Sequence, residues 1–217
     1  MSVLQRPSPA GPATRARARV VAGLLLLAAG AATVLAIMTA EVLYPAAYDP
    51  QRNTISDLAA MRPDDVVRQP SAAVFNVTMV VAGLLIAAAA LLLARAAARR
   101  SAVVPVGLLG LGCVGVGLFP GNTVMAVHEV VSLVAFLSGA LAVLLTAPLS
   151  PRALRPVHAV LGAVSLAMLV GYYLFPDRAL FDALGEGGVE RWIAFPVLLW
   201  LLVLGSALAA GRERGAA

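Results

Sequence analysis

His128 and Glu129 are the neighbouring residues in this sequence that are best suited to proton transfer. Histidine exchanges protons near neutral pH, so His128 is the first candidate for a general base. Ser132 follows one helical turn later and would lie on nearly the same face of a helix. Asp57 or Glu41 could join the pair to hold one catalytic water. The candidate catalytic residues are therefore His128, Glu129 and Asp57, and none of them is identified as a nucleophile.

A second group of polar residues fills the long segment from Glu41 to Gln69. Connections of this length between helices are either functional or disordered. The segment contains Glu41, Tyr44, Tyr48, Asp49, Asn53, Ser56, Asp57 and the run Arg62-Pro63-Asp64-Asp65. Of these, Glu41, Tyr44, Asn53 and Asp57 are the candidates for ligand binding. For Ser56 and Asp57 the alternative is helix capping, because a hydroxyl or carboxylate at the first turn of a short helix satisfies its free N–H groups.

A third group, Glu190-Arg191-Trp192, stands at the start of the last apolar block. A charged side chain at membrane depth is costly and needs a partner. We expect Arg191 to pair with His128 or Glu129, and Glu41 is a third candidate partner. Two interpretations remain open for these polar groups, a structural lock between helical hairpins and a ligand-binding site. The residues of that site would be Glu41, Tyr44, Asn53, Asp57, His128, Glu129, Glu190, Arg191 and Trp192.

A metal or haem site is not expected. The other histidine, His158, starts a different apolar block at the opposite membrane face, so the two imidazoles cannot share one metal ion. The sequence contains no H-E-x-x-H, C-x-x-C or EF-hand spacing. The single cysteine, Cys113, lies inside an apolar block, where we interpret it as a small residue at a helix contact. We therefore predict no metal and no cofactor.

The elements that must position these residues are membrane-spanning helices. The chain is 61% hydrophobic and 12% charged, whereas soluble domains average about 25% charged residues. Its mean hydropathy is +0.92. A helical span needs roughly 20 apolar residues. The qualifying blocks are residues 20–40, 72–94, 102–119, 124–149, 157–175 and 192–210. The prediction is an all-α, polytopic membrane bundle of six transmembrane helices arranged as three hairpins.

The predicted domain organisation is one six-span domain over residues 19–211 with a short tail at each end. Residues 1–18 are expected to form a disordered cytoplasmic tail, and residues 212–217 a second cytoplasmic tail. The first apolar block is interpreted as an uncleaved span because its core exceeds the 7–15 residues that are usual for a signal peptide.

Charge is distributed unequally between the connections. One set, which includes both tails, holds eleven Arg and one carboxylate, and the other set holds five Arg and ten carboxylates. By the positive-inside rule, the Arg-rich side and both termini are cytoplasmic. The chain has no Lys and is rich in Ala, Gly and Arg, which indicates a GC-rich bacterial genome and hence the bacterial cytoplasmic membrane. The net charge of +5 is thus explained by the orientation of the chain in the membrane. We expect membrane lipids as partners of the basic residues, and we expect no nucleic acid.

Aromatic residues gather at the predicted outer boundary of the spans. They are Tyr44, Tyr48, Phe119, Tyr172, Tyr173, Phe175, Phe181 and Trp192. Interfacial belts of Tyr and Trp normally occur at both faces of a membrane. The one-sided distribution favours an aromatic-lined pocket at the outer face, and an ordinary interfacial belt is the alternative.

The outer motifs resemble those of the bacterial and archaeal multi-pass family known as domain of unknown function 998 (DUF998). The resemblance covers roughly residues 18–210. It rests on Glu41…Tyr44-Pro45…Asn53…Ile55-Ser56-Asp57-Leu58, Phe75-Asn76, Gly117…Phe119-Pro120, His128 and Glu190-Arg191-Trp192…Pro196. The chain is more distantly similar to six-pass proteins of the damage-regulated autophagy modulator type, which implies a connection with lipids. The family resemblance implies an architecture and no defined activity.

Three functions fit the sequence. The leading hypothesis is a non-enzymatic protein that binds a lipid or another small amphiphile in an outer-face pocket, for sensing, transport or envelope assembly. The alternative is a membrane-embedded hydrolase of lipid or cell-envelope substrates with His128 as its base. A third possibility is a structural subunit of a membrane complex.

Overall fold

The computed structural model describes residues 11–61 and 66–211 and confirms the all-α prediction. The long helices are α1 (Pro12–Val42), α2 (Ser71–Arg95), α3 (Arg100–Leu118), α4 (Met125–Leu145), α5 (Arg155–Leu174) and α6 (Ala179–Ala209). Short 3-10 helices occur at η1 (Ser56–Leu58), η2 (Ala147–Leu149) and η3 (Arg152–Leu154). In the described part of the chain, six helices are long and apolar enough to cross a membrane. The fold is that of a multi-pass membrane protein.

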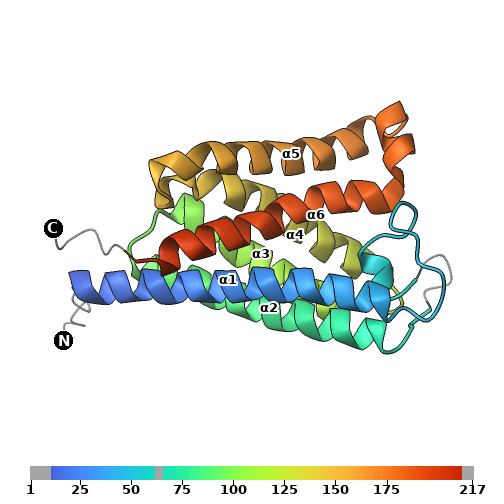
Figure 1. Cartoon of the computed structure of the whole chain (residues 1–217), viewed down its shortest axis with the longest axis horizontal. Helices are drawn as coiled ribbons and strands as arrows, with labels where there is room; N and C mark the ends of the chain where they lie inside the picture. The colour runs from blue at the N-terminus through green and yellow to red at the C-terminus, as the bar shows by residue number, and fades with distance from the viewer. Residues whose placement is uncertain (1–10, 62–65, 212–217) are drawn as a thin grey trace, which may run out of the picture.

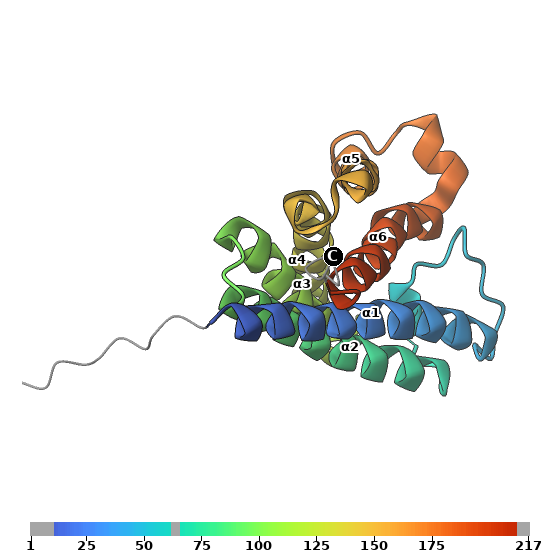
Figure 2. The same cartoon turned by 60° about the vertical axis from the view of Figure 1, so that its left-hand side comes forward.

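The helices form a bundle in which each helix packs against its neighbours in the chain, and α6 returns to pack against α1. The hairpins α1–α2, α3–α4 and α5–α6 are therefore present as predicted. Both views place α5 on the opposite side of the bundle from α1 and α2 (Figures 1 and 2). The α1–α6 contact depends on close backbone approach, since a Cβ on Gly205 would lie 2.6 Å from the Leu27 nitrogen.

The two ends of the bundle differ in charge. One end holds Arg15, Arg17, Arg19, Arg95, Arg99, Arg100, Arg152 and Arg155, and we call it the basic end. The other end carries the connections 43–70, 119–124 and 175–178, and we call it the acidic end. The first and last described residues both lie at the basic end, and the long 43–70 connection folds over the acidic end (Figure 1).

The helix boundaries differ from the sequence prediction at several points. α1 begins at Pro12, where the fixed φ of proline favours the first helical turn, so the predicted tail of residues 1–18 is wrong for residues 12–18. Residues 1–10 and 212–217 lie outside the described part. α4 ends at Leu145, before the predicted limit of 149. Val124 precedes α4 and the helix has no side-chain cap, while Thr123 donates its hydroxyl to the Pro120 carbonyl.

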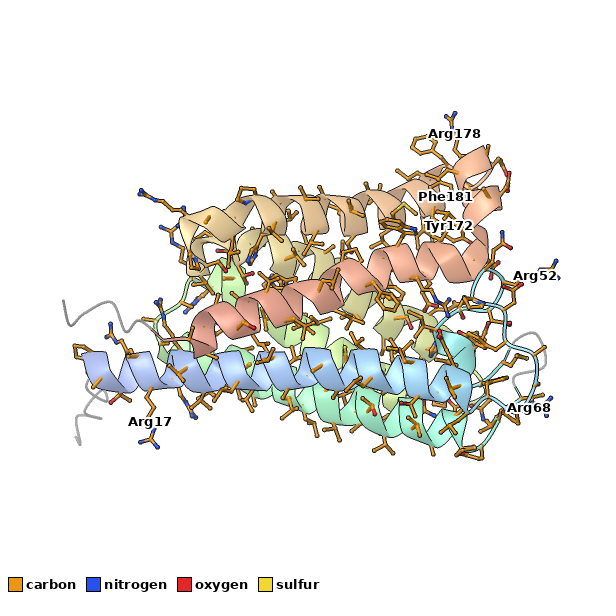
Figure 3. All side chains as sticks on the ribbon, viewed as in Figure 1. Arg17, Arg52, Arg68, Tyr172, Arg178 and Phe181 are labelled. Carbon is orange, nitrogen blue, oxygen red and sulfur yellow. The ribbon has the colours of Figure 1, made fainter. Side chains whose placement is uncertain are left out.

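The largest boundary difference is at α6, which starts at Ala179 and not near residue 192. Its first turns are joined to the remainder across a kink at Gly185, where φ is +66°. These turns are amphipathic rather than uniformly apolar: Phe181 is buried, and its ring packs edge-on against Tyr172 of α5 at 5.7 Å (Figure 3). A hydropathy pattern therefore did not identify them as part of the helix.

Candidate functional site

Arg191 of α6 lies at the centre of a dense polar cluster at the acidic end. Its Nη2 contacts Glu41 Oε1 at 2.6 Å and the Tyr48 hydroxyl at 2.9 Å. Its Nη1 donates to the backbone carbonyls of Pro50, Asn53 and Gly187, each at 2.9 Å. We call this set the Arg191 cluster. It ties α1, the 43–70 connection and α6 together, which is the behaviour expected of a structural lock.

The pairing expected for Arg191 is corrected by this geometry. His128 and Glu129 are on α4, and the hydrogen bonds of the His128 ring go to Phe119 and Ser132. Glu41, the third candidate, is the ion-pair partner because α1 packs directly against α6, whereas α4 lies farther around the bundle. A sequence pattern indicates that Arg191 needs a partner but not which helix lies beside it.

Tyr48 connects the Arg191 cluster to the loop backbone. Its hydroxyl accepts from Arg191 and donates to the Thr54 carbonyl at 2.6 Å. Burial raises the pKa of Tyr48, with the Arg191 charge opposing the shift, so the phenol keeps its proton and its donor role. Tyr44 packs against Tyr48 with 5.3 Å between ring centroids, and burial raises the pKa of Tyr44 as well.

Gly187 allows the 43–70 connection to dock on α6. A Cβ at this position would collide with the backbone carbonyl oxygens of Pro50 and Asn53. The Gly187 N–H donates to the Gln51 carbonyl at 2.9 Å. The backbone contact needs a residue without a side chain, because a rigid backbone atom cannot move aside as a flexible side chain can.

Glu190 organises the first turn of η1. Its carboxylate accepts from the backbone N–H of Ile55 and Ser56 and, at 2.9 Å, from the Ser56 hydroxyl. Asp57 accepts from the Thr54 N–H at 2.8 Å, and the Asp57 N–H contacts the Thr54 hydroxyl at 3.2 Å. Asp57 therefore bonds Thr54, just before η1, and Ser56 donates its hydroxyl to a carboxylate from α6, while the residue that precedes η1, Ile55, provides no side-chain cap.

A cavity of about 170 Å³ lies beneath η1, between the acidic-end halves of α4, α5 and α6. We call it the vestibule. Its polar lining consists of Thr54, Ser56, Asp57, His128, Glu129, Ser132, Tyr172, Tyr173, Glu186 and Glu190. Four of the predicted site residues thus meet here, namely Asp57, His128, Glu129 and Glu190. Of the aromatic residues expected at the outer boundary, Tyr172 and Tyr173 line the vestibule, and Phe136, which was not among them, lines it as well.

The remaining predicted site residues do not line the vestibule. Glu41, Asn53 and Arg191 belong to the Arg191 cluster, and Tyr44 is buried beside Tyr48. Trp192 is 52% exposed and does not line the vestibule. The single site suggested by the sequence is therefore two adjoining structures, a lock and a cavity. The Arg62–Asp65 run lies outside the described residues.

His128 is held in a defined orientation on the vestibule wall. Its Nδ1 is 2.9 Å from the Phe119 carbonyl oxygen, and its Nε2 is 3.4 Å from the Ser132 hydroxyl. A carbonyl oxygen can only accept, so Nδ1 carries the proton and Nε2 presents its lone pair. The Phe119 carbonyl is available because α3 ends at Leu118.

A second, apolar cavity of about 80 Å³ lies deeper, between α1, α2, α3, α4 and α6. We call it the inner cavity. Its lining includes Ile37, Phe75, Met79, Ile86, Leu109, Val116, Val197, Leu198 and Leu201. The vestibule and the inner cavity share four lining residues, which are Ser56, Ser132, Phe136 and Glu190. A polar chamber at the acidic end therefore adjoins an apolar chamber within the bundle.

A separate histidine network, missed by the sequence analysis, lies at the basic end. His158 Nε2 is 2.9 Å from the Ser150 hydroxyl, and Nδ1 is 3.1 Å from the Val143 carbonyl. Nearby, Trp200 Nε1 donates to the Thr146 hydroxyl at 2.9 Å. These side chains are buried and line neither cavity. The only sequence signal was a polar residue early in an apolar block.

Within the described residues, no three His, Cys, Asp or Glu side chains are placed to hold a metal ion. The two histidines lie at opposite ends of the bundle, on α4 near the acidic end and on α5 near the basic end. The vestibule lining offers carboxylates, hydroxyls and one oriented imidazole.

Comparison with protein families matches residues 27–207 to the family described as "Protein of unknown function (DUF998)". The chain belongs to the DUF998 family. The predicted family resemblance is confirmed, and the distant similarity to autophagy modulators stays a prediction. No curated protein and no solved structure matches this DUF998 chain. The matched range contains the Arg191 cluster and the lining of both cavities.

Proposed function

We propose that this DUF998 protein binds a single-chain amphiphile, with the polar head in the vestibule and the hydrocarbon chain in the inner cavity. The observation that carries the proposal is the pair of adjoining cavities of opposite polarity that share Ser56, Ser132, Phe136 and Glu190. A ligand that fills both must be polar at one end and apolar at the other, and the inner cavity of about 80 Å³ must widen, through flexible side chains such as Met79, to admit a full alkyl chain. Binding sites of this kind are mostly apolar with a few placed polar groups.

The vestibule favours a head that donates hydrogen bonds, such as an amine or a hydroxylated group. Its described lining offers the Glu129 carboxylate at the rim and the Nε2 lone pair of His128 as acceptors. Among the described lining residues there is no Arg or Lys. An anionic head would therefore lie among carboxylates of the same charge, and this repulsion costs free energy where the dielectric constant is low.

The membrane itself is the proposed source of the ligand. Leu133 of α4 and Tyr173 of α5 line the vestibule, yet they are 43% and 66% exposed on the bundle surface. η2 and η3 join α4 to α5 at the basic end, so the two helices flank the vestibule only at their other ends. A chain can enter sideways between them without crossing water.

We also propose that the basic end faces the cytoplasm of a bacterium and that the vestibule opens at the outer face. The support is the positive-inside rule applied to the eight arginines of the basic end. In a Cys113→Ala background, Ala47→Cys and Asp177→Cys should react with an impermeant thiol reagent on intact cells. Ser101→Cys and Arg152→Cys should react only after lysis. Labelling of Ser101→Cys from outside would reverse the orientation.

The binding proposal is tested with the dodecyl ether of glycerol, whose uncharged hydroxylated head fits the stated preference, added to the purified full-length protein in lipid nanodiscs. Native mass spectrometry should detect one bound molecule. Ala194→Phe places a ring in the inner cavity and should weaken binding at least tenfold. The matched control is Ala126→Phe, the same change at an exposed position of α4 outside both cavities. Equal affinity of the two variants would contradict the proposed site.

A further inference from the structure

Ser132 and His128 have the geometry of a nucleophile and its base. They are one turn apart on α4, with 3.4 Å between the Ser132 hydroxyl and His128 Nε2. Working pairs lie about 2.6–3.2 Å apart and are often longer before substrate binds. Because the Phe119 carbonyl accepts from Nδ1, the lone pair of Nε2 is directed to the serine hydroxyl. The carbonyl thus fixes the ring, which is the task of the third residue in a catalytic triad.

Ser132 lies where the ester bond of a bound acyl amphiphile would be. Ser132 is one of the residues shared by the vestibule and the inner cavity. An amphiphile that lies across both cavities has its head–chain junction at this point. In acyl amphiphiles that junction is a carboxylic ester, so the ester carbonyl would be placed beside the Ser132 hydroxyl.

We propose that Ser132 and His128 hydrolyse the ester of an acyl amphiphile held in the two cavities, an activity that rests on the proposed binding function. The Ser132 oxygen attacks the ester carbonyl carbon while its proton passes to His128 Nε2. The carbon–oxygen bond to the head breaks, and His128 returns the proton to the leaving alcohol. Water then attacks the acyl-serine with His128 as base, which releases the carboxylic acid and restores Ser132.

The network around His158 supplies an internal comparison for this proposal. Its serine and histidine are closer together, at 2.9 Å, and its Nδ1 is also bound to a backbone carbonyl. His158 is fully buried, Ser150 is 4% exposed, and neither residue lines a cavity. A serine–histidine pair alone therefore does not define a reactive site here. Ser132 differs because it borders the proposed substrate space.

The test uses 1-lauroylglycerol as substrate and its dodecyl ether analogue as a ligand without an ester. Wild-type protein in nanodiscs should release laurate, and an alkyl fluorophosphonate should modify Ser132. Ser132→Ala and His128→Gln should each lower laurate release at least 100-fold. The matched control is Ser138→Ala, a buried serine of the same helix whose hydroxyl bonds the Val134 carbonyl outside both cavities.

Two readouts separate failure of the chemistry from failure of binding. If the ether analogue binds wild-type protein and no laurate is released above the Ser132→Ala level, the nucleophile assignment is overturned and the binding proposal stands. If the ether analogue does not bind, both are overturned. Melting temperatures of all variants are measured in parallel. A Ser132→Ala protein that melts with the wild type and still releases laurate at the wild-type rate would assign hydrolysis to other residues.

Discussion

The two histidines of this protein make the same kinds of hydrogen bond in opposite surroundings. Each donates through Nδ1 to a backbone carbonyl and contacts a serine hydroxyl through Nε2. His158 is sealed where α4, η2 and α5 meet at the basic end, whereas His128 borders a cavity at the acidic end. A histidine–serine hydrogen bond is therefore a structural contact where it is enclosed by packed side chains and a candidate site where it borders a cavity.

The surroundings also decide what each contact contributes to stability. A buried polar group that loses its partner pays its full cost of desolvation, because water cannot replace the bond. His158 is fully buried and lines neither the vestibule nor the inner cavity. At His128 the vestibule can admit water, so a lost hydrogen bond can be replaced. Substitutions at the two ends should therefore differ in stability and in function.

The largest loss of stability is expected from a substitution in the Arg191 cluster, which also lies at the acidic end. Arg191→Ala leaves Glu41 and three backbone carbonyls without their partner. Breaking such a partly buried pair should cost about 3–5 kcal/mol of unfolding free energy. Thermal melting in nanodiscs measures the loss against Arg178→Ala, which removes an exposed arginine at the same end. Matching melting temperatures would show that the cluster does not lock the fold.

The second prediction concerns the sealed network. His158→Gln cannot satisfy both the Ser150 hydroxyl and the Val143 carbonyl in the same space, and it should cost about 2 kcal/mol. Binding of the ether analogue by the folded fraction should stay at the wild-type level, because His158 lines neither cavity. A tenfold loss of affinity without a loss of stability would contradict the structural assignment.

The smallest expected stability effect comes from the same substitution at the other histidine. His128→Gln should cost under about 1 kcal/mol, since the vestibule lets water solvate the Phe119 carbonyl. The melting temperature should stay close to the wild type while laurate release falls. If His128→Gln and His158→Gln lose equal stability, the distinction between an open and a sealed network is wrong.

The sequence predicted the spans and the gathering of polar residues at one end of the bundle better than it predicted the contacts between those residues. Apolar block length is a property of the chain alone, so the six helices and three hairpins followed from it. Arg191 was recognised as a charge in need of a partner, but Glu41 is 150 residues away in the chain. Only the α1–α6 contact selects Glu41 over His128. Neither the role of Ser132 at two cavities nor the η1 contact of Glu190 has a local sequence signal.

The start of α6 is a second feature that the sequence analysis did not predict. Hydropathy detects residues that must avoid water along a full span, whereas the turns that begin at Ala179 bury only one side. Gly185 then changes the helix direction and brings Gly187 against the loop backbone. These are effects of packing between distant segments, which a window along the chain does not detect.

The central claim, that one amphiphile spans both cavities, is tested most directly by photolabelling at two depths. Two dodecyl ethers of glycerol are compared, one with a diazirine at the chain end and one with a diazirine beside the head. The chain-end probe should label inner-cavity residues such as Met79, Leu109 and Leu198. The head-side probe should label vestibule residues such as Leu133 and Tyr173. If both probes label only exposed positions outside the cavities, such as Leu111 and Leu199, the account is contradicted.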